Sequence, residues 1–149
     1  MRVQVPLTTP SPISLIFPPY IGGYHGYGSP RNRMRYFVLN EHRATVEVFD
    51  TQRWKWWMRF NARERVVART DFGTVFRVTT VFMGKADGDD MGVFTTAVFV
   101  WYCPWPVQML HDKTWHEAEQ THKENKQRVY IRYAAEREHG GYPLTEWPF

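Results

Sequence analysis

Residues 74–83 read TVFRVTTVFM, and residues 93–103 read VFTTAVFVWYC. Both runs are rich in β-branched and aromatic residues, which favour strands, and neither contains proline or glycine. Residues 84–92 (GKADGDDMG), which lie between the two runs, are acidic and contain several glycines. The second run ends at PWP, residues 104–106. We therefore predict two strands of an antiparallel sheet, joined by a loop.

Upstream of these runs, the sequence predicts three further strands and a short helix. RYFVL (35–39) and TVEVF (45–49) flank the polar turn NEHR, which indicates a hairpin, and RVVAR (65–69) precedes the turn TDFG. Asp50 can cap a helix over TQRWKWWMRF (51–60), because its carboxylate can accept hydrogen bonds from the free amides of the first turn.

The last predicted element is a long helix. Thr114 suits the N-cap, and Glu117 three residues later completes a capping box, so the helix can run to about residue 138, before Gly140 and Gly141. One mostly apolar face recurs near the helical period, formed by Trp115, Ala118, His122, Asn125, Val129 and Tyr133. The whole pattern predicts an α+β fold, an antiparallel sheet of about four to five strands with the short tryptophan-rich helix and the long C-terminal helix on one face.

The chain divides into an extended N-terminal arm (1–33), a compact domain (34–138) and a C-terminal tail (139–149). Residues 1–33 hold six of the ten prolines and four of the ten glycines, which exclude a helix or a central strand. The arm is nevertheless too apolar for an inert linker. We expect it to lie against its own domain or another subunit, so a homo-oligomer stays open, with contacts through Ile16, Phe17, Tyr20 and Tyr24.

Charge, cysteine content and hydropathy exclude several kinds of site and of cellular location. The net charge is +4, but residues 1–33 carry three arginines and no acidic residue, so residues 34–149 hold 16 basic and 15 acidic side chains. A single cysteine, Cys103, excludes an internal disulfide and a zinc site of several cysteines. The proline-broken apolar run at 12–21 is too short to span a bilayer, and no signal-peptide pattern is present. We expect a soluble protein with no membrane partner.

The helix at 51–60 carries the first set of candidate binding residues. Helical spacing places Trp54, Trp57 and Met58 on one side, where core packing explains them. Trp56 falls among basic residues, and an exposed tryptophan in that setting is typical of an anchor for a protein or a stacked base. The candidates are Arg53, Lys55, Trp56 and Arg59.

The acidic loop gives a second set of candidates, Asp87, Asp89 and Asp90. Its spacing fits neither a calcium-binding EF-hand nor a phosphate-binding loop. We interpret it as a solvated hairpin tip, which can also present phosphate-like charge to a basic partner.

The histidines and the cysteine do not form a pattern typical of catalysis. The histidine spacing lacks the i, i+4 pair of helical zinc sites, so we expect no metal and no cofactor. We interpret His116 as a surface residue and His122 as a core histidine with a backbone partner. Cys103 follows a strand among aromatic residues, where burial would keep it inert, and no nucleophile motif is present. The sequence therefore favours a non-catalytic protein.

Several segments, in order, resemble a family of small uncharacterised proteins from tailed bacteriophages, over about residues 34–130. They are MRYFVLNEH, the tryptophan-bearing helix, RVVART, RVTTVFMG, FTTAVF and TWHEAEQTH. The resemblance implies a phage gene acting in the host cytoplasm. The leading hypothesis is a binding protein for a host or phage protein, or for a signalling molecule, that inhibits a host defence system. Three alternatives stay open: a virion or assembly protein using its arm, a nucleic-acid-binding protein, and an enzyme with His116 or His122 as base.

Overall fold

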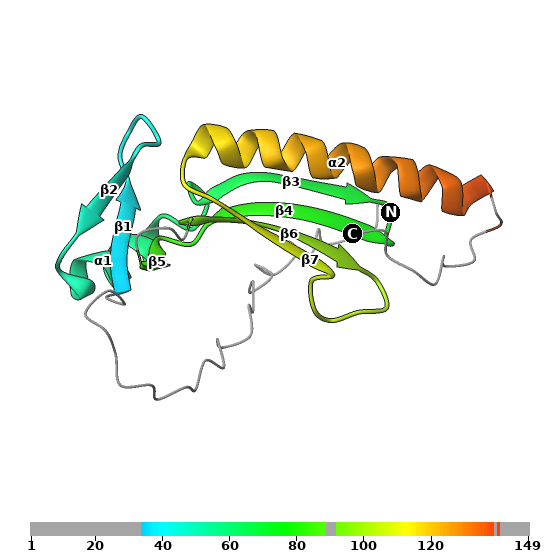
Figure 1. Ribbon diagram of the computed structural model, residues 1–149. Helices are drawn as coiled ribbons and strands as arrows, with labels where there is room; N and C mark the ends of the chain where they lie inside the picture. Colours follow the sequence, from blue (N-terminus) through cyan, green and yellow to red (C-terminus); the bar gives the residue numbers. More distant parts are fainter. Residues whose placement is uncertain (1–33, 89–91, 139, 141–149) are drawn as a thin grey trace, which may run out of the picture.

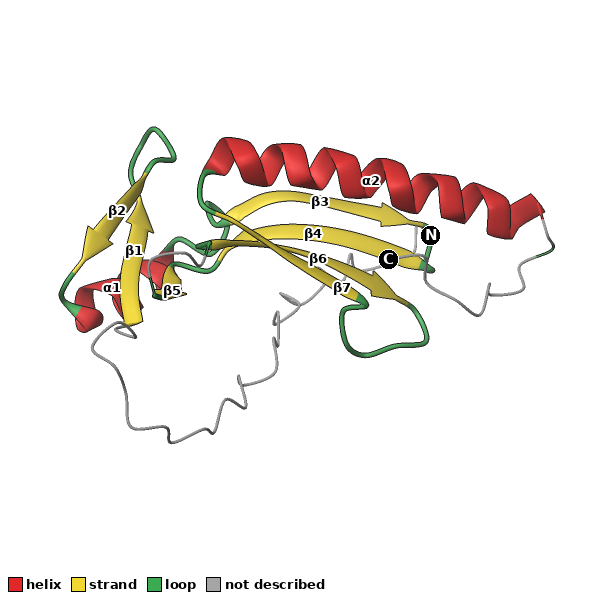
Figure 2. Ribbon diagram, in the orientation of Figure 1, coloured by secondary structure: helices red, strands yellow, loops and turns green. Residues whose placement is uncertain are grey.

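The computed structural model describes residues 34–88, 92–138 and 140. The predicted arm with its candidate contacts, the tail from residue 141 onward, and the candidates Asp89 and Asp90 lie outside the described residues. The described chain forms two antiparallel sheets and two helices (Figures 1 and 2).

The small sheet contains three strands, β1 (Met34–Leu39), β2 (Thr45–Val48) and β5 (Lys85–Asp87), in the order β2-β1-β5. Strands β1 and β2 form the predicted hairpin, with Val38 opposite Val46. Helix α1 (Thr51–Phe60) follows β2 and packs against β1 and β2.

The large sheet contains four strands, β3 (Val66–Phe72), β4 (Phe76–Phe82), β6 (Phe94–Val100) and β7 (Gln108–Asp112), in the order β3-β4-β6-β7. The two predicted strand runs are its central strands, β4 and β6, which pair from Phe76 opposite Val100 to Phe82 opposite Phe94. Helix α2 (Trp115–Glu138) lies along one face of this sheet (Figure 1).

The α+β class, the antiparallel pairing and both helices are confirmed, while the distribution of the strands differs from the expectation. The strands form two sheets, and each helix packs on a different one. Two strands were not predicted. β5 lies within the segment interpreted as a loop, and its three residues form a strand by pairing with β1, where Met34 lies opposite Asp87. β7 follows PWP and is held by β6, with Met109 opposite Ala97.

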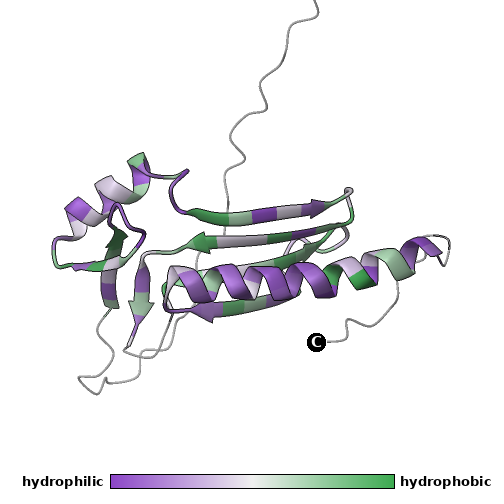
Figure 3. Ribbon diagram, turned by 90° about the horizontal axis from the view of Figure 1, so that it is seen from above, coloured by the Kyte–Doolittle hydropathy of each residue, from purple (hydrophilic) through white to green (hydrophobic). Residues whose placement is uncertain are grey.

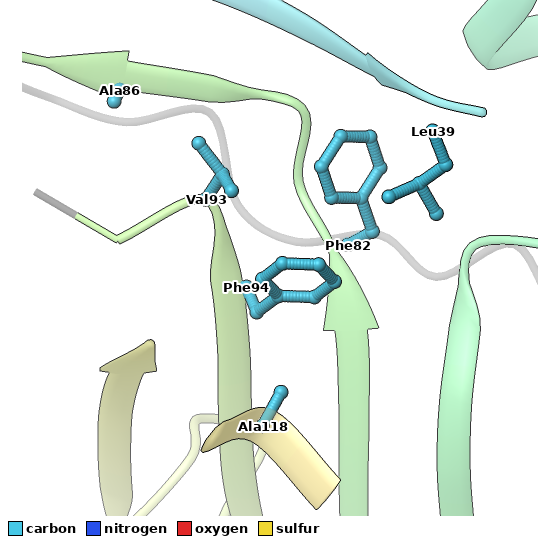
Figure 4. Close-up of a cluster of buried hydrophobic side chains, with 6 residues drawn as sticks. All are labelled: Leu39, Phe82, Ala86, Val93, Phe94 and Ala118. Atoms are coloured by element: carbon cyan, nitrogen blue, oxygen red, sulfur yellow. The ribbon is translucent and has the colours of Figure 1, made fainter. Parts of the chain in front are cut away.

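A shared hydrophobic cluster connects the two sheets. It joins Leu39 of β1 and Ala86 of β5 to Phe82 of β4, and it also contains Val93, Phe94 and Ala118. Figure 4 shows Leu39 beside the ring of Phe82, with Phe94 next to them and Ala118 on the adjoining helix. The ring centroids of Phe82 and Phe94 are 5.1 Å apart. We infer that the two sheets form one folding unit, because neither can expose this cluster without losing its packing.

Helix α2 begins as predicted, and its packing agrees with the prediction from Ala118 to Val129 but differs near its end, where Arg132 and Glu136 are buried and Tyr133 is half-buried. The Thr114 hydroxyl accepts a hydrogen bond from the Glu117 amide at 3.2 Å, and the Glu117 carboxylate accepts one from the Thr114 amide at 3.0 Å. The buried side chains of α2 are Ala118, His122, Asn125, Val129, Arg132 and Glu136. Figure 3 shows the outer face of α2 as largely hydrophilic over its first half, whereas Tyr130 and Ile131 are exposed nearer its end.

Candidate partner-binding surface

The ends of α1 are fixed by side-chain hydrogen bonds. The Asp50 carboxylate accepts hydrogen bonds from the backbone amides of Gln52 and Arg53 at 2.9 and 3.2 Å, as the sequence predicts. At the other end, the side chain of Asn61 donates to the Trp57 carbonyl at 2.9 Å. These contacts satisfy backbone groups that a short helix otherwise leaves without partners.

The inner side of α1 packs on the small sheet and the shared cluster. Trp54 lies 4.8 Å from Tyr36, and Trp57 lies 5.8 Å from Phe82, measured between ring centroids. Trp54, Trp57 and Met58 are half-buried, so the predicted inner side is confirmed. α1 is therefore anchored through aromatic side chains on one side only.

The outer side of α1 presents an exposed aromatic pair among cations. Trp56 is 65% exposed and Phe60 is 60% exposed, and their ring centroids are 4.5 Å apart. The guanidinium of Arg59 lies 5.7 Å from the Phe60 ring centroid. We call this surface the α1 outer face, and its exposed residues are Arg53, Lys55, Trp56, Arg59 and Phe60. Four of the five were predicted as candidates, and Phe60 was missed although it follows Trp56 at helical spacing.

Charge is concentrated around this helix. Residues 50–65 contain five basic and two acidic residues, a net charge of +3. Residues 115–138 of α2 contain five basic and five acidic residues. A partner of the α1 outer face should therefore carry negative charge, and electrostatic attraction would speed their association.

A groove of about 360 Å³ adjoins the last turn of α1, between the β1–β2 turn and the start of α2. Arg43, which has a positive φ of 62°, places its guanidinium 4.5 Å from the ring centroid of Trp115. The groove carries both signs of charge, and its lining is Leu39, Asn40, Glu41, Arg43, Trp57, Asn61, Arg63, Glu64, Val66 and Trp115. The contact between Arg43 and Trp115 was not predicted, because only the fold brings the hairpin turn to the start of α2.

A second exposed aromatic group lies in the connection between β6 and β7. Trp101, Tyr102 and Trp105 are 68%, 52% and 55% exposed. No charged residue occurs from position 93 to position 110. This segment therefore contributes no cation of its own, although Arg77 of β4 lines the same pocket as Trp101. It provides a comparison for the α1 outer face.

Of the acidic candidates, only Asp87 lies within the described residues, and it is on β5 and not on α1. Asp87 is exposed on β5, whereas α1 packs against β1 and β2. Asp89 and Asp90 lie outside the described residues. Asp87 therefore belongs to a separate part of the surface.

His122 is buried beneath α2, and its partners differ from the prediction. Its Nδ1 lies 2.9 Å from the Thr80 hydroxyl, and its Nε2 lies 3.1 Å from the Thr70 hydroxyl, so its partners are side chains and not backbone groups. Burial, with a smaller effect from Lys126, lowers the pKa of His122. The ring is 4% exposed and uses both nitrogens in the core, which is a structural arrangement and not that of an accessible base.

His116 is exposed on α2 as predicted, and Cys103 is a half-buried free thiol packed at the edge of the cluster around Val78 and Val98. In residues 34–88, 92–138 and 140, no three His, Cys, Asp or Glu side chains are grouped so that they could hold a metal ion.

Comparisons of the chain with protein-family models, curated proteins and solved structures found no match. Neither of the two described helices is both long enough and apolar enough to cross a membrane. The site therefore has to be interpreted from its own geometry.

Proposed function

We propose that this chain is a non-catalytic binding protein that uses the α1 outer face to bind an acidic surface of another protein. One observation carries the proposal. Trp56 and Phe60 form an exposed aromatic pair beside cations, on a helix whose other side packs against the shared cluster.

The fold does not require this aromatic pair. Trp54 and Trp57 already provide the inner contacts of α1, whereas most of the surface of Trp56 and Phe60 faces solvent. Tryptophan and arginine are enriched among the residues that dominate binding energy at interfaces. Burying two aromatic side chains that a fixed helix already holds in place would add affinity at little entropic cost.

A second part of the proposal is that this binding takes place during a bacteriophage infection. It rests on the resemblance of residues 34–130 to small proteins of tailed phages, with a host or phage protein as partner in the host cytoplasm. A role in inhibiting a host defence system follows from the kinds of genes that phages carry. The virion alternative requires the arm, which lies outside the described residues.

Nucleic acid is the second candidate ligand, because the same surface combines an exposed tryptophan with a net charge of +3 over residues 50–65. Bases stack on aromatic rings, and phosphates pair with lysine and arginine. Such binding must weaken steeply as salt concentration rises.

The test compares two tryptophans of similar exposure. Proteins captured from host lysate by the wild-type chain are identified, and each is purified and titrated against wild type, Trp56→Ala and Trp101→Ala. We expect Trp56→Ala to weaken binding by about 30-fold, the effect of losing about 2 kcal/mol at an interface hot spot. Trp101→Ala should leave the affinity unchanged. If only Trp101→Ala lost binding, the binding site would lie in the β6–β7 connection and not on the α1 outer face.

The nucleic-acid candidate is tested with the same variants by fluorescence anisotropy of a labelled single-stranded oligonucleotide. Salt-sensitive binding that Trp56→Ala abolishes would support nucleic acid as the ligand. Equal binding of wild type and Trp56→Ala, or no binding at low salt, would exclude the α1 outer face as a nucleic-acid platform.

A further inference from the structure

The two central strands of the large sheet are buried on both faces over residues 78–82 of β4 and 94–98 of β6. Thr80 contacts His122 of α2 and Thr96 of β6, so it points toward α2. Side chains alternate along a strand, and the neighbours Thr79 and Val81 therefore point to the opposite face. Pairing in register places Ala97 and Thr95 beside them. On this opposite face Thr79, Val81, Thr95 and Ala97 are only 3%, 2%, 3% and 1% exposed.

No described element explains that burial. Apart from strand pairing, α2 is the one element within the described ranges that packs on the large sheet, and it lies on the other face. An antiparallel sheet with a free face alternates between buried and solvated side chains, and β4 and β6 do not alternate in this way. The cover of this face therefore lies outside the described helices and strands.

The covered area is narrow, and its four buried side chains are two threonines, a valine and an alanine. On the same face, the edge strands stay open, because Met109 opposite Ala97 is 46% exposed and Val66 opposite Val81 is 37% exposed. The Thr79 hydroxyl is buried without a hydrogen-bond partner among the described residues, whereas the Thr95 hydroxyl lies 3.1 Å from His111 Nδ1 of the edge strand β7. A strip as wide as two central strands fits one extended segment better than a second helical layer.

We propose that residues 12–27 of the same chain bind along this face as an extended segment, over β4 and β6. Residues 1–33 lead into β1, whose start lies on the side of the large sheet opposite α2 in Figure 1. Residues 12–27 contain Ile13, Leu15, Ile16, Phe17, Tyr20 and Ile21, and Pro12, Pro18 and Pro19 favour an extended backbone. Helix α2, which leads to the tail, lies over the other face of the large sheet in Figure 1.

The length of the segment is sufficient. Sixteen residues in extended conformation span about 50 Å, and a seven-residue strand such as β4 spans about 23 Å. Residues 28–33, between this segment and β1, add about 20 Å of reach. Residues 12–27 can therefore follow the whole length of the covered strip.

The experiment uses a cysteine reporter in the full chain, with Cys103 replaced by serine. Thr79→Cys places a thiol of similar size on the covered face, and Met109→Cys places one on the open edge of the same face. The arm variant replaces Ile16, Phe17, Tyr20 and Tyr24 by serine, and the matched tail variant replaces Tyr142, Leu144 and Trp147 by serine. Labelling by a maleimide is followed by mass spectrometry, and circular dichroism checks that each variant is folded.

We expect the maleimide to label the thiol of Thr79→Cys at least about tenfold faster in the arm variant than in the chain with the wild-type arm. The labelling rate of Met109→Cys should be unchanged. The tail variant should leave both rates unchanged. Equal rates at Thr79→Cys with and without the arm substitutions would overturn the proposal, and so would acceleration by the tail variant.

A second measurement leaves the sheet unaltered and does not depend on the stability of the arm variant. A photoreactive phenylalanine analogue at position 20 is activated in the native chain, and the cross-linked peptides are sequenced. Cross-links within one chain to residues 74–83 or 93–100 would support the proposal. Cross-links to α2, cross-links between two chains, or none at all would overturn it.

Discussion

Gly84 is the residue that determines how closely α1 approaches the small sheet. Its φ is +67°, and a Cβ at this position would lie 2.9 Å from both the Met58 sulfur and the Phe37 carbonyl oxygen. Gly84→Ala should therefore destabilise the protein by about 2 kcal/mol or more, since it combines a strained backbone with a steric clash. Denaturant unfolding measures this change.

Gly88 provides the matched control for that substitution. Its φ is also positive, at +85°, but a Cβ there would meet nothing within 4 Å. Gly88→Ala should cost only the backbone strain, about 1 kcal/mol. Equal losses at the two positions would show that close packing of α1 does not constrain Gly84.

His122 should make the stability depend on pH. Burial, and to a smaller extent Lys126, lower the pKa of the folded His122 below its usual 6.5, so the folded state binds fewer protons than the unfolded state. The stability that the neutral ring contributes is present above pH 6.5 and is lost as the pH falls from there toward the lowered pKa. We expect the free energy of unfolding to decrease between about pH 7 and 5.5.

Two variants isolate the effect of His122. His122→Gln should flatten this pH dependence, whereas the exposed His116→Gln should retain it. Subtracting the variant's profile from that of wild type also removes the contribution of Asp112, whose pKa is raised by burial. A pH profile of His122→Gln identical to that of wild type would contradict the assignment.

At the scale of elements, the capping box should govern where α2 begins. The Thr114 hydroxyl accepts a hydrogen bond from the Glu117 amide, and the Glu117 carboxylate accepts bonds from the amides of Thr114 and Lys113. Thr114→Ala removes one of these acceptors and should destabilise the protein by about 1 kcal/mol. Thr114→Ser keeps a hydroxyl and should unfold at nearly the wild-type denaturant concentration. A loss as large in Thr114→Ser as in Thr114→Ala would mean that the hydroxyl is not the stabilising group.

At the scale of the whole molecule, the shared cluster should make the two sheets unfold together. Leu39 is 8% exposed on β1 and packs with Phe82 of β4. Leu39→Ala should cost about 2–5 kcal/mol, because it leaves a cavity between the sheets. Val46→Ala, at a position 45% exposed on β2, should cost about 0.5 kcal/mol or less.

Two probes follow that unfolding. Three of the seven tryptophans are on α1, so tryptophan fluorescence includes a signal from the small sheet, and far-ultraviolet circular dichroism is dominated by α2. We expect coincident transitions in wild type and in Leu39→Ala, as for a single cooperative unit. Separate transitions in wild type would show that the small sheet unfolds independently.

The sequence alone is sufficient to predict the elements that depend on local interactions. Asp50 and Thr114 cap their helices through bonds to residues two or three positions away, so their roles are visible in the sequence. The inner and outer sides of α1 follow from helical spacing, which correctly separates Trp54 and Trp57 from Trp56. The runs that became β4 and β6 are long and β-branched, and no competing local structure suits them.

Only the tertiary structure decided how these elements are grouped. β5 and β7 are strands because β1 and β6 supply their hydrogen-bond partners, and short segments such as KAD carry no strand signal of their own. Likewise, the hydroxyl partners of His122 and the contact between Arg43 and Trp115 join residues far apart in the chain. The sequence determined the helices, the central strands and the outward position of Trp56, because these depend on neighbours within a few residues. The division into two sheets, the groove and the covered face depend on long-range packing, which local sequence patterns do not encode.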